Sequence, residues 1–388
     1  MSDGQSITVL GAGIAGLAVA QLLARFGRAV TVLEQASEIR EVGAGLQISP
    51  NGTRVLRAMG LGGGLDAASD RAGAVVLADG QSGAAITRLD LLGLRTADDY
   101  RLMHRADLIA LLAEGARAAG VDIRLDRKVT DIALGNHPPR VTLANGEMVE
   151  AGLLVGADGL HSRMRTALNG EAVPFFTHHS AWRATIPAEP GAAPVVQVFL
   201  GPGKHLVSYP LRGGRLRNIV AVEERRRWVE ESWSLTDDPM TLRVAFEDFA
   251  PEVRGWLDQV DRPNLWGLFR HPVAKTWWGK SAVILGDAAH PTLPFLAQGA
   301  NLALEDAWVL ADALSRYPQA EALARYQSRR EGRARRVIEA ANANARNFHL
   351  SGLSRAVAHL GLRSLGAVAP SLLLSRFDWL YGHDVTAG

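Results

Sequence analysis

The chain has 388 residues, which is too long for one small domain and favours two or three. Hydrophobic residues make up 47% and charged residues 21%, a balance that excludes a disordered or collagen-like chain. The formal charge of +2 gives no argument for a nucleic-acid partner, and the lack of any cysteine excludes disulfides, cysteine-ligated metal or iron–sulfur sites and a cysteine nucleophile.

The first segment of the chain, between Asp3 and Arg25, carries no charge and is about as long as a membrane span. Several glycines interrupt it, and it lacks the basic leader of a secretory signal. The sequence therefore predicts a cytoplasmic protein with no stable membrane insertion.

A strand–turn–helix–strand pattern fills this segment and continues past it. Ile7–Leu10 predicts a buried parallel strand, Leu17–Phe26 a helix, and Ala29–Leu33 a second strand that ends at Glu34. The turn between the first strand and the helix reads Gly11-Ala12-Gly13-Ile14-Ala15-Gly16. This is the fingerprint of a βαβ unit that binds a dinucleotide.

Each glycine of this turn serves a structural purpose that a larger residue would not. Gly11 permits the tight turn, Gly13 lets a pyrophosphate approach the backbone, and Gly16 allows the helix to pack closely on the strand. The helix N-terminus offers free N–H groups and a positive dipole to the phosphates. Glu34 can accept hydrogen bonds from ribose hydroxyls and would repel a 2′-phosphate. The fingerprint predicts an adenine dinucleotide but does not distinguish FAD from NAD.

Three further motifs follow along the chain. The first is Gly43–Asn51, which reads GAGLQISPN. The second is Gly156–Arg163, GADGLHSR, directly after the predicted strand Leu153–Val155. The third is Gly286–Asn301, which follows the predicted strand Ser281–Leu285 and leads into a predicted helix at 302–314. Polar residues that end parallel strands lie at the edge of the sheet where open α/β folds bind ligands.

The middle of the chain loses the helical periodicity. Ala181–Ile186, Val195–Leu200, His205–Leu211 and Leu216–Val222 predict strands joined by glycine-containing hairpin turns. Together with the turn-rich segment 72–100, they predict a second, smaller antiparallel sheet.

Two features near the C-terminus have ordinary interpretations. Arginines 325, 329, 330, 333, 335 and 336 predict a solvated helical face, with steering of an anionic cofactor as the alternative. His349–Leu374 predicts an amphipathic helical segment interrupted by Pro370, packed on the cofactor-binding domain or at a dimer surface.

In combination, these motifs resemble the single-component (group A) FAD-dependent aromatic hydroxylases of the p-hydroxybenzoate hydroxylase type. Within that family the chain is most similar to the salicylate and hydroxynicotinate monooxygenase branch. The resemblance implies an α/β fold: a Rossmann-type FAD-binding domain, an interleaved β-rich substrate domain and a helical C-terminus. We expect the FAD-binding domain to comprise 1–71, 101–175 and 267–340, the substrate domain 72–100 and 176–266, and the helical segment 341–388.

The resemblance also implies a reaction. NADH or NADPH reduces FAD, the reduced flavin forms a C4a-hydroperoxide with O2, and this species hydroxylates a small aromatic compound, phenolic or salicylate-like. The alternatives are another flavin reaction, such as urate-type hydroxylation of a heteroaromatic compound or a dehydrogenation, and a non-catalytic FAD-fold binding protein. We expect a monomer or homodimer with no nucleic-acid partner and no metal site.

Four charged residues receive cofactor roles from the resemblance. Asp287 would hold ribityl or ribose hydroxyls of FAD, unless it caps a helix. Arg105 would contact FAD, unless it is a solvated first-turn charge on a helix over 107–119. Asp158 and Arg163 lie in a segment that would support FAD and take part in NAD(P)H binding, with Asp158 orienting Arg163 on a phosphate, unless the two form an ordinary surface pair. The full set of expected cofactor residues is Gly11, Gly13, Ile14, Ala15, Gly16, Glu34, Gln35, Gly45, Leu46, Arg105, Val129, Asp158, Asp287, Gly299, Ala300 and Asn301.

Three residues are expected to be catalytic. His205 and Tyr209 are four apart on a predicted strand and so share a face. By resemblance they line the aromatic pocket, where the histidine accepts the phenolic proton, and Pro294 lines the oxygen-reaction site. The alternative is a structural histidine hydrogen bond and an ordinary strand tyrosine.

Three more residues are expected to bind substrate. Arg183 could hold a carboxylate or be a surface strand residue. Gln47 replaces a histidine, and Phe295 a polar residue, of the hydroxynicotinate-type members, which points away from that exact substrate.

Overall fold

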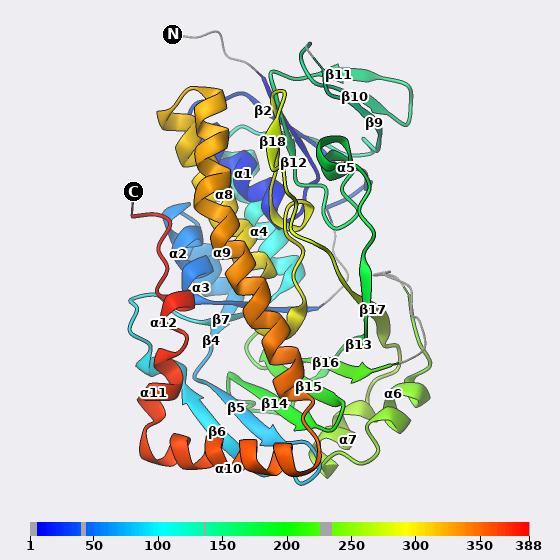
Figure 1. Ribbon diagram of the computed structural model, residues 1–388, viewed down its shortest axis with the longest axis vertical. Coiled ribbons are helices and arrows are strands. Elements are labelled where there is room, and N and C mark those ends of the chain that lie inside the picture. Colours follow the sequence, from blue (N-terminus) through cyan, green and yellow to red (C-terminus); the bar gives the residue numbers. More distant parts are fainter. Residues whose placement is uncertain (1–5, 40–43, 136, 226–234, 388) are drawn as a thin grey trace.

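The computed structural model describes residues 6–39, 44–135, 137–225 and 235–387, and Gly43 of the motif Gly43–Asn51 lies outside them. A parallel sheet with its helices forms one half of the molecule, and an antiparallel sheet forms the other (Figure 1). The long helix α9 (Gln319–Phe348) runs along both halves (Figure 1). The fold is therefore mixed α/β, as the sequence predicts.

The six-stranded sheet has the order β18-β19-β12-β1-β2-β8 and is parallel except for the edge strand β18. Its strands are β1 (Ile7–Leu10), β2 (Val30–Leu33), β8 (Asp122–Arg124), β12 (Leu153–Gly156), β18 (Trp278–Gly279) and β19 (Ala282–Ile284). All residues of β1 and β12 are buried, because a parallel sheet is covered on both faces.

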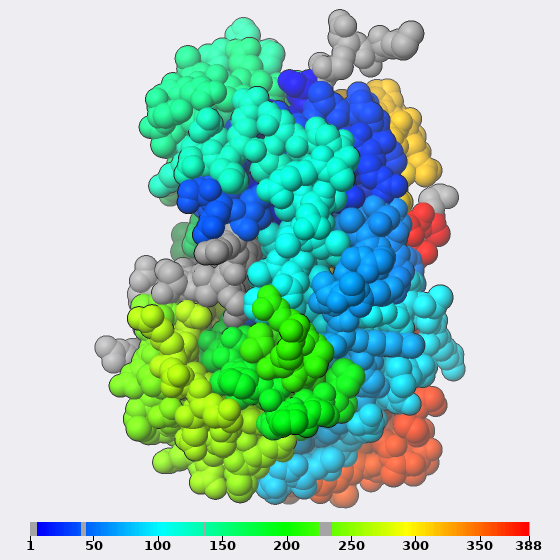
Figure 2. All heavy atoms as spheres, turned by 180° about the vertical axis from the view of Figure 1, so that it is seen from behind, coloured from blue at the N-terminus to red at the C-terminus, as the bar shows by residue number. Residues whose placement is uncertain are grey.

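The seven-stranded sheet has the order β17-β13-β16-β15-β14-β5-β6. All neighbours are antiparallel except β14 and β5. Its strands are β5 (Ala74–Asp79), β6 (Ala85–Asp90), β13 (Phe175–Pro187), β14 (Val195–Gly201), β15 (Lys204–Leu211), β16 (Leu216–Glu224) and β17 (Asn264–Arg270). The sheet joins segment 72–100 to the middle of the chain, and both lie in the lower half of the space-filling view (Figure 2).

Two small antiparallel sheets complete the strands. One has the order β11-β10-β9 and comprises β9 (Val129–Ala133), β10 (Arg140–Leu143) and β11 (Met148–Glu150). The other has the order β3-β7-β4 and comprises β3 (Gly45–Ile48), β4 (Ser69–Arg71) and β7 (Arg101–His104). Strand β3 of this second small sheet carries Gln47.

The helices surround these sheets. The remaining ones are α1 (Ile14–Arg25), α2 (Pro50–Ala58), α3 (Gly62–Ala68), α4 (Arg105–Ala118), α5 (Arg163–Asn169), α6 (Pro239–Ala245), α7 (Pro251–Leu257), α8 (Gly299–Arg316), α10 (Gly352–Val368), α11 (Pro370–Ser375) and α12 (Asp378–Tyr381). Three 3-10 turns lie at Leu91–Gly93, Gly286–Ala288 and Pro294–Leu296. None of the helices in the described ranges is both long enough and apolar enough to span a membrane.

The observed elements start or end a few residues from the predicted ones. Helix α1 begins at Ile14 rather than at 17, and α8 begins at Gly299 rather than at 302, because the glycine turns before them already enter helical geometry. Strand β13 is longer than predicted because it pairs along its length with β16 and again with β17.

The arginine-rich face of α9 is not uniformly solvated. Arg325, Arg329 and Arg335 are exposed, as predicted. Arg330 is only 1% exposed and forms ion pairs with Glu305 and Asp306 of α8. Arg333, whose side chain is 8% exposed, pairs with Glu305. The interpretation as a solvated face is wrong for these two, because α9 packs against α8 on the side that carries them.

The expected packing of the C-terminal segment on the cofactor-binding domain is wrong for α10, whereas the alternative of a dimer surface stays a prediction. Helix α10 lies against β6 at the edge of the seven-stranded sheet (Figure 1). Its Arg355 pairs with Asp79, at the end of β5, at 2.6 Å. The helix therefore covers the antiparallel sheet rather than the dinucleotide-binding βαβ unit. The predicted interruption at Pro370 is confirmed, since α11 begins there after α10 ends at Val368.

Candidate functional site

Two adjoining cavities lie where the two halves of the molecule meet. Their volumes are about 730 Å³ and 260 Å³, and their walls share Gly13, Arg105, Ala157, Arg183 and Trp266, among others. The larger volume is typical of sites for organic ligands. We refer to them as the larger and the smaller cavity.

The glycine turn forms one wall of the larger cavity. Gly11 has a φ of +96°, a conformation that L side chains rarely adopt. A Cβ atom on Gly16 would lie 1.9 Å from the carbonyl oxygen of Gly11, so only glycine fits there. Helix α1 starts next to the cavity with no side-chain cap and no acidic residue in its first turn. Its N–H groups are thus available to an anion.

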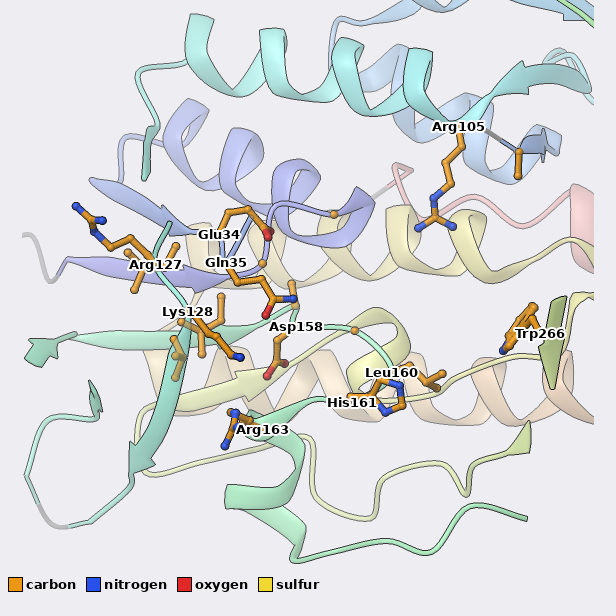
Figure 3. Close-up of a pocket in the computed structure, with 18 of the residues that line it drawn as sticks. Glu34, Gln35, Arg105, Arg127, Lys128, Asp158, Leu160, His161, Arg163 and Trp266 are labelled. Atoms are coloured by element: carbon orange, nitrogen blue, oxygen red, sulfur yellow. The ribbon is translucent and has the colours of Figure 1, made fainter. Parts of the chain in front are cut away.

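Polar side chains line the end of the larger cavity next to β2. Figure 3 shows them together: Glu34, Gln35, Arg127 and Lys128. Oε2 of Glu34 accepts a hydrogen bond from Ala12 N at 2.7 Å, which fixes the carboxylate against the glycine turn. A glycine cradle, a ribose-binding carboxylate and nearby cations are the groups that an adenine dinucleotide requires. The residues present therefore fit FAD.

Asp158 lies on the wall of the larger cavity but does not pair with the Arg163 side chain. Its carboxylate accepts hydrogen bonds from Ser162 Oγ at 2.5 Å and Met164 N at 3.1 Å. Burial raises the pKa of Asp158, and these hydrogen bonds oppose the rise. Arg163 donates instead to the Thr130 carbonyl at 2.9 Å. The predicted orienting pair is wrong because the lone pairs of Asp158 are used to hold the start of α5.

Asp287 and Arg105 both line the smaller cavity. Asp287 lies in the 3-10 turn after β19, and it is the N-cap neither of that turn nor of α8. Burial raises the pKa of Asp287, whereas the charges of His290 and Arg105 lower it. Arg105 begins α4 and lines both cavities, so it is not a solvated surface charge.

The smaller cavity brings together most of the expected reaction residues. His205 and Tyr209 from β15 meet Gln47 from β3, Arg183 from β13 and Pro294 from the loop before α8. The sharing of one strand face by His205 and Tyr209 is thus confirmed. Strand β3 and the loop before α8, which are more than 200 residues apart in the chain, both contribute to this wall.

Burial sets the protonation of three of these side chains. It raises the pKa of Tyr209 above its ordinary value, so the phenol remains protonated at neutral pH. Burial, reinforced by the charge of Arg105, lowers the pKa of Arg183 to about 10, which still leaves the guanidinium charged. It also lowers the pKa of His205 well below the ordinary value, so the imidazole is neutral.

The other expected cofactor residues divide between the two walls. Gln35 and Val129 line the larger cavity. The smaller cavity is lined by Ile14, Ala15, Gly45, Leu46, Gly299 and Ala300.

Two expected contact residues lie behind the wall instead of on it. Phe295 is buried with its ring 5.5 Å from that of His205, so it supports the histidine and does not face the smaller cavity. Asn301 is fully buried, and its amide donates to the Gln47 carbonyl at 3.1 Å while its oxygen accepts from Ser49 N at 3.0 Å. It therefore ties β3 to α8. The expected direct contacts of both residues are corrected accordingly.

Two residues at or near the cavity walls escaped the sequence analysis. Trp266 on β17 places its ring under Arg183, whose guanidinium lies 4.8 Å from the ring centroid. Asn218 on β16 accepts a hydrogen bond from Gly45 N at 2.7 Å and so positions the second glycine motif. Asn218 follows Arg217 in a mixed strand, so no sequence pattern marked it. No local pattern marks Trp266.

Comparisons with known proteins agree with this geometry. The model of the FAD binding domain family matches residues 5–341. The 3-amino-4-hydroxybenzoate 2-monooxygenase PtmB3 of Streptomyces platensis is 38% identical over 97% of this chain and 96% of its own. The 3-hydroxybenzoate 6-hydroxylase 1 of Aquipseudomonas alcaligenes is 32% identical over 98% of each chain.

Solved structures show the same fold. Klebsiella pneumoniae HpxO complexed with FAD and uric acid superposes with a TM-score of 0.85 and 23% identity, covering 97% of this chain and 96% of that one. A salicylate hydroxylase substrate complex gives a TM-score of 0.83 and 23% identity, covering 100% and 97%. With the glycine cradle, the two cavities and the full-length relatives in place, the chain belongs to the FAD binding domain family, in its branch of FAD-dependent (group A) aromatic hydroxylases.

Proposed function

We propose that this monooxygenase hydroxylates a hydroxybenzoate-type aromatic acid with FAD, O2 and NADH or NADPH. The observation that carries the proposal is the smaller cavity, in which a buried cation, a neutral phenol and a neutral imidazole face one space next to the dinucleotide cradle. The relatives that act on 3-amino-4-hydroxybenzoate and 3-hydroxybenzoate support it, since both compounds carry a ring hydroxyl and a carboxylate.

In this proposal the chain supplies binding and proton transfer. Arg183, held over Trp266, binds the substrate carboxylate. Tyr209 donates a hydrogen bond from its protonated hydroxyl, and His205 accepts the proton of the substrate hydroxyl. A deprotonated ring oxygen makes the ring richer in electrons and therefore more reactive toward an electrophilic oxygen.

FAD would occupy both cavities. The glycine turn and Glu34 would hold the adenosine and pyrophosphate half, while Asp287 and Arg105 would flank the ribityl chain. The ring system would enter the smaller cavity beside Pro294 and the N-terminus of α8, where the helix dipole favours the negative charge of a reduced ring. Bound FAD supplies electron transfer from the nicotinamide and activation of O2.

A panel of aromatic acids tests the substrate class. FAD-loaded protein should oxidise NADH or NADPH faster with 3-amino-4-hydroxybenzoate, 3-hydroxybenzoate or salicylate than with benzoate, which lacks the hydroxyl. At least one hydroxylated acid should give a product with one added oxygen, detected by mass spectrometry. Stimulation of nicotinamide oxidation by uric acid, with none by any hydroxybenzoate, would reject the substrate class while leaving the enzyme class intact.

Two substitutions in the smaller cavity test the proposed roles. His205→Ala should lower kcat for hydroxylation about 100-fold or more, the range lost with a general base, while FAD remains bound. Tyr209→Phe should divert oxygen to peroxide and raise KM, because a hydrogen bond to the substrate is lost. Peroxide yield and product yield measured together check both results. Unchanged turnover and coupling in both variants would contradict the assigned roles.

A further inference from the structure

A chain of hydrogen bonds leads from the smaller cavity to the protein surface. Nδ1 of His205 lies 2.7 Å from Nε2 of His349, and Nδ1 of His349 lies 3.1 Å from Oε1 of Glu224. The side chains of His205 and His349 are buried, whereas that of Glu224 is 55% exposed. His205 lines the smaller cavity, and the other two side chains lie behind it. The three form a continuous path for a proton between cavity and solvent.

Two adjacent strands and the residue after a distant helix build this path. His205 is on β15, Glu224 ends the neighbouring strand β16, and His349 directly follows α9. The β14–β15 turn fixes their arrangement, since Gly203 N donates to the His349 carbonyl at 3.3 Å and the Gly203 carbonyl accepts from Glu224 N at 2.8 Å. These backbone contacts hold the ends of the path independently of its side chains.

Aromatic rings enclose the two histidines. The ring of Phe348 lies 5.1 Å from that of His205, and the ring of Phe295 lies 5.5 Å from His205 and 6.4 Å from His349. The ring of His179 lies 5.1 Å from that of His349, so the surroundings of the two imidazoles are largely aromatic. Phe295, which does not line the smaller cavity, therefore forms part of the apolar surroundings of the path.

We propose that His349 and Glu224 relay to solvent the proton that His205 takes from the substrate hydroxyl. This inference rests on the proposed function. As the substrate O–H bond breaks, an N–H bond forms at Nε2 of His205, and the proton on its Nδ1 moves to Nε2 of His349. The proton on Nδ1 of His349 moves to the Glu224 carboxylate, which releases it to water.

The transfer is balanced and reversible. One proton enters at the cavity and one leaves at Glu224, no electrons move, and each imidazole ends as its other neutral tautomer. When the hydroxylated ring regains its aromaticity, the reverse transfer returns a proton to the product oxygen and restores both tautomers. No net charge is therefore left on the buried rings.

The electrostatics of the rings favour this mode of transfer. Burial lowers the pKa of His205 well below its usual value and that of His349 to about 4, so neither ring keeps a second proton at neutral pH. His205 can accept a proton at one nitrogen only if it gives up the proton at the other. Besides each other, the ionisable groups that act on His205 and His349 are His179 and Glu224. His179 in turn is influenced by Glu224, Arg270 and His178.

Stopped-flow mixing of FAD-loaded protein with 3-hydroxybenzoate or 3-amino-4-hydroxybenzoate tests the relay. A pH indicator in weak buffer follows proton release without O2, and the flavin spectrum follows binding. His349→Gln keeps hydrogen-bonding groups but cannot pass a proton, so it should slow proton release at least about tenfold with binding preserved. Glu224→Gln should slow it as well. His137→Gln replaces an exposed histidine on the loop between β9 and β10, outside the path, and should leave proton release at the wild-type rate.

Chemical rescue separates relay from support. Imidazole added to His349→Ala should restore proton release in a concentration-dependent manner, a response that loss of packing alone does not give. Wild-type proton-release rates in His349→Gln, or binding-competent His349→Ala without rescue, would overturn the relay while leaving the proposed function standing. If neither acid perturbs the flavin spectrum of the wild-type protein, the substrate proposal fails and the relay fails with it.

Discussion

Replacing Arg330 with methionine is expected to lower the free energy of unfolding by about 3–5 kcal/mol, the cost of removing one partner of a buried ion pair. Nε of Arg330 lies 2.7 Å from Oδ1 of Asp306, and Nη1 lies 2.7 Å from Oε2 of Glu305. All three side chains are at most 1% exposed. Methionine fills the volume but leaves two buried carboxylates without their shared cation. Chemical denaturation measures the change.

The same variant should also bind FAD less tightly, because the ion pairs reach the cofactor wall. Asp306 accepts a hydrogen bond from Gly286 N at 3.0 Å, next to Asp287, and Glu305 accepts from Asn51 Nδ2 at 2.6 Å. Arg335→Met is the matched control, since Arg335 is exposed and pairs with Glu331 of its own helix. Arg335→Met should lower the free energy of unfolding by less than about 0.5 kcal/mol. Equal effects of the two variants would contradict the importance of the buried cluster.

This cluster also sets the response to acid. Burial alone would raise the pKa of Glu305 and of Asp306, but nearby positive charges outweigh it and lower both to about 2, from ordinary values of 4.5 and 3.8. These charges are Arg330 and Arg333 for Glu305, and His290 and Arg330 for Asp306. Groups with a lowered pKa in the folded state stabilise it fully above the ordinary pKa and lose that contribution as the pH falls toward the folded value. Wild-type stability should therefore decrease between about pH 4.5 and pH 2, and the Arg330 variant should begin to unfold at higher pH.

Gly16→Ala is expected to abolish stable FAD binding and to destabilise the protein even without cofactor. The new Cβ would lie 1.9 Å from the Gly11 carbonyl oxygen and 3.3 Å from Ala157 Cβ. The backbone of the glycine turn has to move to remove this overlap, and that movement opens the cradle. Titration of FAD-free protein with FAD, followed by flavin fluorescence, gives the affinity, and thermal unfolding gives the stability.

Gly13→Ala separates contact with the cofactor from distortion of the turn. Its Cβ meets no atom within 4 Å, and its φ of −77° suits alanine. The FAD-free protein should therefore keep its thermal stability, while the methyl group obstructs the pyrophosphate and weakens FAD binding at least tenfold, about 1.4 kcal/mol. If Gly13→Ala binds FAD as the wild type does, the pyrophosphate does not approach this turn as proposed.

Features that depend on local spacing could be predicted from the sequence. The glycine turn follows from residues 11, 13 and 16 between a strand and a helix, and Glu34 from the end of the next strand. His205 and Tyr209 face the same cavity because strand side chains alternate. In each case one element of secondary structure is enough to place the side chain.

Features that depend on which elements pack together could not be predicted. Arg330 looks like its solvated neighbours on α9, and only the packing of α8 against it provides two carboxylates. Phe295 immediately follows Pro294, which lines the smaller cavity, yet the ring of Phe295 packs against His205 and does not line that cavity. His349 follows a long helix with no motif around it, and its link to His205 depends on the β14–β15 turn.

The most direct test of the proposed activity is the origin of the oxygen in the product. FAD-loaded protein, NADH or NADPH and 3-amino-4-hydroxybenzoate or 3-hydroxybenzoate are incubated under 18O-labelled O2 in unlabelled water. We predict a hydroxylated acid that carries the label in its new hydroxyl group, formed in proportion to the nicotinamide oxidised and dependent on His205. A product whose new oxygen comes from water, or nicotinamide oxidation that yields only peroxide with every acid of the panel, would contradict the account.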